Sequence, residues 1–115
     1  MKKPLLGLLS LLAVTVTAAA ADPDPAKWDA VLAQAKGETV YFNAWGGAEN
    51  INAYLGWASE EMQKRFGVKL VHVKLEDTGT AVAKVVAEKA VGKNRGGTVD
   101  LIWINGGNFL SMKDQ

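Results

Sequence analysis

Two segments of the chain share one pattern of positions, a continuous apolar run that ends at polar and glycine residues. Residues 40–45 read Val-Tyr-Phe-Asn-Ala-Trp before Gly46 and Gly47, and residues 101–105 read Leu-Ile-Trp-Ile-Asn before a second glycine pair. An apolar run without alternation is typical of a strand buried on both faces. Ligands bind at the carboxyl ends of parallel strands, and glycines there let the backbone turn sharply or be approached closely. The pattern therefore predicts a polar, glycine-rich rim along one edge of a sheet.

The rest of the chain alternates between helical and strand periodicity. Apolar residues at helical spacing predict helices over residues 25–36, 51–66 and 82–90, with another beginning at residue 108. The strands are expected over residues 39–44, 68–75 and 99–104. Alternating strands and helices predict right-handed crossovers and a parallel sheet. We therefore expect an α/β fold in three layers, with the strand order second, first, third.

The helical periods also predict which side chains are buried. The first helix is expected to have Asp24 as its N-cap and to bury a stripe that begins at Trp28. The second helix is expected to bury Tyr54 and to turn Asn52 and Ser59 toward solvent.

The second and third strands differ in polarity. The second carries charged residues, which suits a strand at the sheet edge, and it leads to Thr78 or Thr80 as the cap of the next helix. The third is the most apolar stretch after residue 21, so Trp103 within it is expected in the core.

The first residues have the composition of a secretory signal peptide. Two lysines at residues 2–3 precede an apolar run over residues 5–16 and small residues over 18–21. The apolar run is well short of the ~20 residues that span a bilayer, which disfavours a membrane anchor. We expect cleavage between Ala21 and Asp22 and release into the periplasm.

Composition is that of an ordinary globular domain. Hydrophobic residues make up 49% and charged residues 22% of the chain. Its net charge of +1 includes both lysines of the signal peptide, so residues 22–115 are close to neutral, which argues against a nucleic-acid partner. The chain contains no cysteine, so its single modest core has no disulfide to stabilise it.

Residues suited to catalysis or metal binding are scarce. His72 is the only histidine, and without cysteine neither a zinc site nor a Cys–His pair is expected. Residues 46–51 read Gly-Gly-Ala-Glu-Asn-Ile, so the glycine fingerprint of dinucleotide-binding domains is missing. We therefore expect a binding protein without catalytic residues, cofactor or metal.

The candidate ligand-binding residues are the polar, glycine and aromatic residues at the expected strand ends. They are Asn43, Trp45, Gly46, Gly47, Asp77, Thr78, Asn105, Gly106 and Asn108. The asparagine amides can bind a solute or close the turn onto nearby backbone. The glycines can expose N–H groups to a ligand oxygen or serve turn geometry alone. Trp45 can stack on an aromatic or cationic solute or pack against the following helix.

Parts of the sequence resemble a known family. The signal peptide, residues 28–36 and residues 41–47 resemble the start of a periplasmic solute-binding protein of an ABC transporter, within extracellular solute-binding family 1 and its thiamine-, iron- and polyamine-related cluster. Residues 96–106 resemble the third strand of the same proteins. The resemblance implies two lobes that close around a solute, of which residues 22–115 would form an incomplete N-terminal lobe. The chain would then be a fragment or a natural truncation.

The resemblance implies the exported solute-binding component of an ABC importer. Such a protein would be a monomer that captures a small-molecule solute and delivers it to the membrane permease. Two alternatives stay open: a fragment of a secreted α/β enzyme whose catalytic residues lie downstream, and a non-functional truncated remnant with exposed apolar surface. A second lobe downstream would favour the receptor, and a nucleophile with its base would favour the enzyme.

Overall fold

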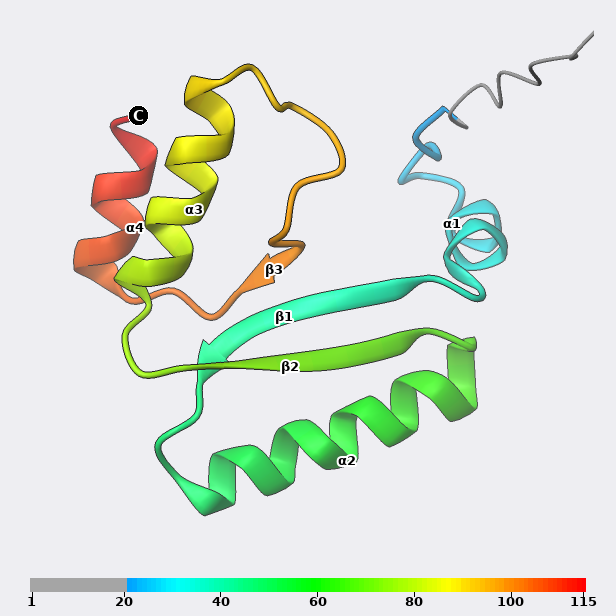
Figure 1. Ribbon diagram of the computed structural model, residues 1–115. Helices are drawn as coiled ribbons and strands as arrows, with labels where there is room; N and C mark the ends of the chain where they lie inside the picture. Colours follow the sequence, from blue (N-terminus) through cyan, green and yellow to red (C-terminus); the bar gives the residue numbers. More distant parts are fainter. Residues whose placement is uncertain (1–20) are drawn as a thin grey trace, which may run out of the picture.

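The computed structural model describes residues 21–115, and the expected signal peptide lies outside them except for Ala21. The elements follow in the order α1 (Trp28–Ala35), β1 (Thr39–Trp45), α2 (Glu49–Phe66), β2 (Lys69–Leu75), α3 (Gly79–Ala90), β3 (Leu101–Ile102) and α4 (Gly106–Lys113) (Figure 1). None of the helices within residues 21–115 is long and apolar enough to cross a membrane.

The three strands form one parallel sheet in the order β2-β1-β3, so the predicted α/β class and strand order are confirmed. β1 and β2 pair along their whole length, from Thr39 opposite Lys69 to Trp45 opposite Leu75. Their carboxyl ends therefore lie level with each other. β2 is an edge strand, as its charged residues predict.

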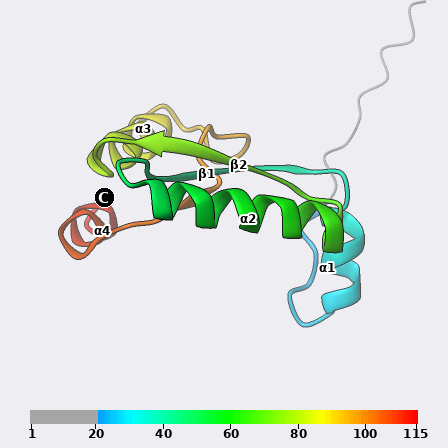
Figure 2. The same ribbon diagram turned by 90° about the horizontal axis from the view of Figure 1, so that it is seen from below.

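The helices cover both sides of the sheet. α2 and α3 lie on opposite sides of the two long strands (Figure 2), as right-handed crossovers toward opposite edges require. α2 ends at Gly67, whose φ of 68° is a left-handed conformation that glycine adopts without a Cβ penalty. α3 and α4 lie beside each other near the carboxyl ends of the strands (Figure 1).

The core is small, and the inner face of α2 matches the expected stripe only in part: Leu55 is buried and Ile51, Ala58 and Met62 are half-buried, as predicted, but Tyr54 is exposed. The buried apolar residues are Ala44, Leu55, Val68, Leu75, Ala81 and Val82. Ser59 donates a hydrogen bond to the carbonyl of Leu70 (2.6 Å), and Asn52 donates one to the carbonyl of Gly46 (2.9 Å). Tyr54 is exposed and packs on Trp57, with ring centroids 5.6 Å apart. The prediction for these residues was wrong because polar side chains on the inner face bind backbone groups at the sheet.

α1 begins later than predicted and buries none of its residues. Asp24 does not cap it: the carboxylate accepts the N–H of Ala26 (3.0 Å) in a turn before the helix. Trp28, at the start of the expected apolar stripe, is 62% exposed. The residues of α1 stay exposed because the helix lies at one end of the sheet and not across its face (Figures 1 and 2).

β3 is a two-residue edge strand, which corrects the expectation of a buried six-residue strand. The Asp100 carboxylate accepts the N–H of Tyr41 (2.8 Å), so at this position a side chain accepts the hydrogen bond that a backbone carbonyl would accept in a longer strand. Trp103 lies beyond β3 and is 51% exposed, so its expected place in the core is also wrong. Its ring stacks on Phe42, with centroids 6.4 Å apart and planes inclined by 5°.

Candidate functional site

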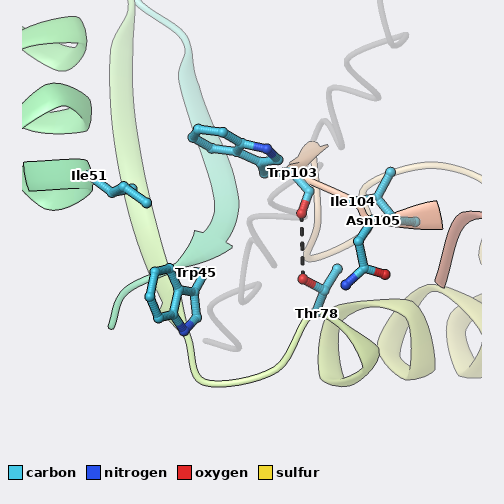
Figure 3. A pocket seen from close by; sticks show the side chains of 6 residues that line it. All are labelled: Trp45, Ile51, Thr78, Trp103, Ile104 and Asn105. Carbon is cyan, nitrogen blue, oxygen red and sulfur yellow. Dashed lines mark hydrogen bonds between the residues drawn. The ribbon is translucent and has the colours of Figure 1, made fainter. Parts of the chain in front are cut away.

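An open cavity of about 390 Å³ lies at the carboxyl ends of the strands. Its lining residues are Trp45, Ile51, Thr78, Trp103, Ile104 and Asn105 (Figure 3). They come from the end of β1, the first turn of α2, the start of α3 and the segment that joins β3 to α4. The cavity therefore lies at the edge of the sheet where the sequence predicts a rim.

Trp45 borders this cavity and two hollows beside it. One, of about 400 Å³, is also lined by Gly46, Gly47, Lys74, Leu75 and Glu76. The other, of about 360 Å³, is also lined by Glu76, Asp77, Thr78, Asn105 and Asn108. The indole is 46% exposed, so a large part of its surface is available for contact.

The first glycine pair is shaped by its neighbours. A Cβ on Gly47 would lie 2.5 Å from a ring carbon of Trp45, so the indole occupies the space that a side chain would need. Gly46 donates its N–H to the carbonyl of Leu75 (2.9 Å), and its Cβ would lie 2.6 Å from that of Lys74. Gly46 therefore extends the β1–β2 ladder.

The asparagines occupy different positions. Asn43 lies inside β1 with 1% exposure, donates to the carbonyl of Tyr41 (3.3 Å) and lines none of the three rim hollows. Asn105 caps α4, because its side-chain oxygen accepts hydrogen bonds from the backbone N–H of Asn108 (3.2 Å) and from the side-chain amide of Asn108 (2.9 Å). A Cβ on Gly106 would meet no atom within 4 Å, so the backbone there is open.

Two residues after β2 hold the rim together. The Asp77 carboxylate accepts the N–H of Gly79 (2.6 Å) at the start of α3. Thr78 is the N-cap residue of α3, as predicted, but its side chain makes no capping hydrogen bond. The Thr78 hydroxyl donates to the carbonyl of Trp103 (3.5 Å), which links the β2 end to the segment after β3 (Figure 3). Thr80 donates to the carbonyl of Asp77 (2.8 Å).

Sequence reasoning missed six residues that line the three hollows of the rim: Ile51, Lys74, Leu75, Glu76, Trp103 and Ile104. Lys74 is the penultimate residue of β2 and Ile104 ends the predicted third strand, so their position next to the predicted rim was a usable signal. Ile51 and Trp103 carried no such signal, because their periodicity indicated buried positions. Within residues 21–115 no group of three or more His, Asp or Glu side chains is placed to hold a metal ion.

The fold and rim define an α/β protein with an all-parallel sheet and an open cavity at the strand ends. No family model and no solved structure matches the chain. It is similar to Protein YnjB of Escherichia coli (strain K12), with 44% identity over 110 residues that cover 96% of this chain. The chain spans 26% of the length of that relative.

This similarity corrects the expected family. The relative's name gives no solute or transporter, and no family model matches, so the assignment to extracellular solute-binding family 1 is wrong. The residues behind the assignment are apolar strands that run into glycine-rich turns. Such features recur wherever a parallel strand ends at a tight turn, so they are weak evidence for any one family.

Proposed function

We propose that the rim at the ends of β1, β2 and β3 binds a small, positively charged solute without covalent chemistry. The observation that carries the proposal is the hollow of about 360 Å³ beside Trp45, whose lining includes the carboxylates of Glu76 and Asp77 and no basic residue. A cation over the indole face gains roughly 0.5–2 kcal/mol. Nearby carboxylates add attraction for the same charge.

Polar groups at the rim can orient such a solute. Asn105 and Asn108 line the same hollow as the two carboxylates and offer amide groups. Lys74 lines the neighbouring hollow of about 400 Å³ and not this one, so it would repel a cation there. The charged side chains thus favour a cation in the hollow that Asp77 and Asn105 line.

The exposed rings indicate how the site would be completed. Trp45 and Trp103 are each about half exposed at the cavity. The proposal includes a facing wall, supplied by another domain or protein, that closes on the solute. Export to the periplasm and delivery to an ABC-importer permease stay predictions from the sequence, as does the monomeric state.

The first experiment compares probe solutes on the chain by NMR titration. Benzamidinium is an aromatic cation, tetraethylammonium a cation without a ring, and benzoate an aromatic anion. We expect saturable binding of benzamidinium, weaker binding of tetraethylammonium and none of benzoate. Equal binding of benzoate, or no saturable binding of either cation, would refute the proposal.

A pair of variants tests the role of the indole. Trp45→Leu should weaken benzamidinium binding by about tenfold, because the stacking surface is lost. Trp28→Leu is the matched control, since Trp28 is 62% exposed on α1 at the other end of the sheet. An equal loss in both variants would contradict binding at the rim.

A further inference from the structure

A hollow of about 510 Å³, separate from those of the rim, lies between α1 and the end of α2. It is lined by Leu32, Ala33, Lys36, Gln63, Lys64, Arg65, Phe66 and Gly67. α1 lies at the end of the sheet where α2 stops (Figures 1 and 2), and β1 and β2 begin there at Thr39 and Lys69. This hollow is therefore at the opposite end of the strands from the rim.

Its lining has three basic side chains and no acidic one. Arg65 is neutralised by Glu61, which accepts from two of its guanidinium nitrogens at 2.6 Å each. Within residues 21–115, neither Lys36 nor Lys64 belongs to an ion pair. Two ammonium groups thus border one hollow without a carboxylate.

Two carbonyls near the end of α2 accept backbone hydrogen bonds. Gly67 donates its N–H to the carbonyl of Gln63 (3.0 Å), and Val68 donates to that of Met62 (3.4 Å). These two carbonyls are engaged by backbone donors, and within residues 21–115 neither ammonium group is paired with a carboxylate.

The hollow also has an apolar part. Leu32 is half-buried on α1, and Phe66 is 36% exposed at the end of α2. The aliphatic stem of Lys36 lies over Gly67, because a Cβ there would be 3.2 Å from the Lys36 Cγ. Long basic side chains commonly cover apolar surface with their stems and keep the charge at its border.

We propose that this hollow binds a small amphiphilic anion, with its apolar part against Leu32 and Phe66 and its negative head between Lys36 and Lys64. Binding by the two lysines alone or by the two apolar residues alone would be weak, because exposed ion pairs gain little and the apolar area is modest. Together they select a molecule that has both a negative head and an apolar body.

A set of probes with matched tails tests this selection by calorimetric titration of the unmodified chain. Decanoate carries the negative head, decanol a neutral one and decyltrimethylammonium a positive one, while acetate has the head without the tail. We expect only decanoate to bind, and more weakly at high salt because the attraction is screened. Equal binding of decanol or decyltrimethylammonium, or no binding of decanoate, would overturn the proposal.

Variants that remove positive charge test whether decanoate binds at Lys36 and Lys64. The double change Lys36→Gln with Lys64→Gln should weaken decanoate binding by about fivefold or more. Lys84→Gln, at an exposed position of α3, is the matched control and should leave the affinity unchanged. Circular dichroism shows whether each variant keeps the fold. An equal effect of the double and control changes would refute the assignment.

Binding to vesicles distinguishes two ligands that carry such a negative head group, a membrane lipid and a free amphiphile. Sedimentation with phosphatidylglycerol vesicles, lost in the double variant and absent with phosphatidylcholine, would identify a lipid as the ligand. Binding of decanoate without binding to either vesicle would identify a free amphiphile.

Discussion

At the rim, the position of the Trp45 indole depends on the absence of a side chain at Gly47. The indole can lie where it does only because residue 47 has no side chain, since a Cβ would come within 2.5 Å of the ring. The ring in turn borders all three hollows at the strand ends. One missing methyl group thus helps to set the stacking surface on which the proposed function depends.

We expect Gly47→Ala to displace the indole and to weaken benzamidinium binding by about tenfold, as Trp45→Leu does. The stability should change little, because residue 47 is exposed. NMR titration measures the affinity and thermal unfolding the stability.

Gly107→Ala is the control for this change. A Cβ there meets nothing within 4 Å, and residue 107 lies in α4, where alanine stabilises a helix by up to about 1 kcal/mol relative to glycine. If Gly107→Ala lowered the affinity as much as Gly47→Ala, the steric account of the rim would be wrong.

Among the elements, the connection from α3 to β3 is held by one carboxylate. Glu88 accepts the N–H of Thr98 at 3.1 and 3.2 Å and pairs with Lys93 at 3.6 Å. A Cβ on Gly97 would lie 2.7 Å from a Glu88 oxygen, so the chain approaches this carboxylate closely. The backbone hydrogen bond from Thr98, more than the charge of Lys93, lowers the pKa of Glu88 from its ordinary 4.5.

The sign of this shift predicts a pH dependence. A lowered pKa means that the contact stabilises the fold above the unfolded value and is lost as pH falls through the folded value. We expect the Thr98 amide signal in NMR to titrate with a midpoint below 4.5 and to lose this transition in Glu88→Gln. Glu60→Gln, on α2, should leave the transition in place. A midpoint at or above 4.5 would contradict the contact.

The elements also show how far sequence reasoning reaches. β1, β2, α2 and α3 were predictable because each is a long segment with a clear pattern of apolar residues and a clear stop, such as Gly67 after α2. β3 was mispredicted because its apolar run has the pattern of a buried strand, although β1 is its only neighbour within residues 21–115. It pairs with β1 only at Leu101 and Ile102, and just before it the Asp100 carboxylate bonds the N–H of Tyr41, a residue far away in sequence.

The same distinction applies to the rim. Trp45 and the residues after β2 were predictable because a parallel sheet brings its carboxyl ends together. Asn43 was placed at a strand end because its amide interrupts an apolar run, but it lies inside β1 and bonds its own strand. The end of β1 at Trp45 can be recognised only from its pairing with β2, which continues to Leu75.

At the largest scale, six buried apolar residues among residues 21–115 support a sheet whose surroundings remain largely exposed. Trp28, Trp57, Trp103, Phe109 and Leu110 are each more than half exposed. A core of this size in a small domain rarely supplies more than about 3–5 kcal/mol of stability. The loss of a single core side chain is therefore comparable to the whole stability of the fold.

We expect Leu55→Ala to unfold the chain or bring it close to unfolding, because truncation of a buried leucine costs about 2–5 kcal/mol. Leu55 is 3% exposed on the inner face of α2, whereas Leu110 on α4 is 59% exposed, so Leu110→Ala should shift the unfolding curve only slightly. Urea unfolding followed by circular dichroism compares the two variants. Similar curves for both would mean that the buried residues do not form the stabilising core. A cooperative transition lost only in Leu55→Ala would show that α2 and the sheet fold as one unit, with the rim built on that unit.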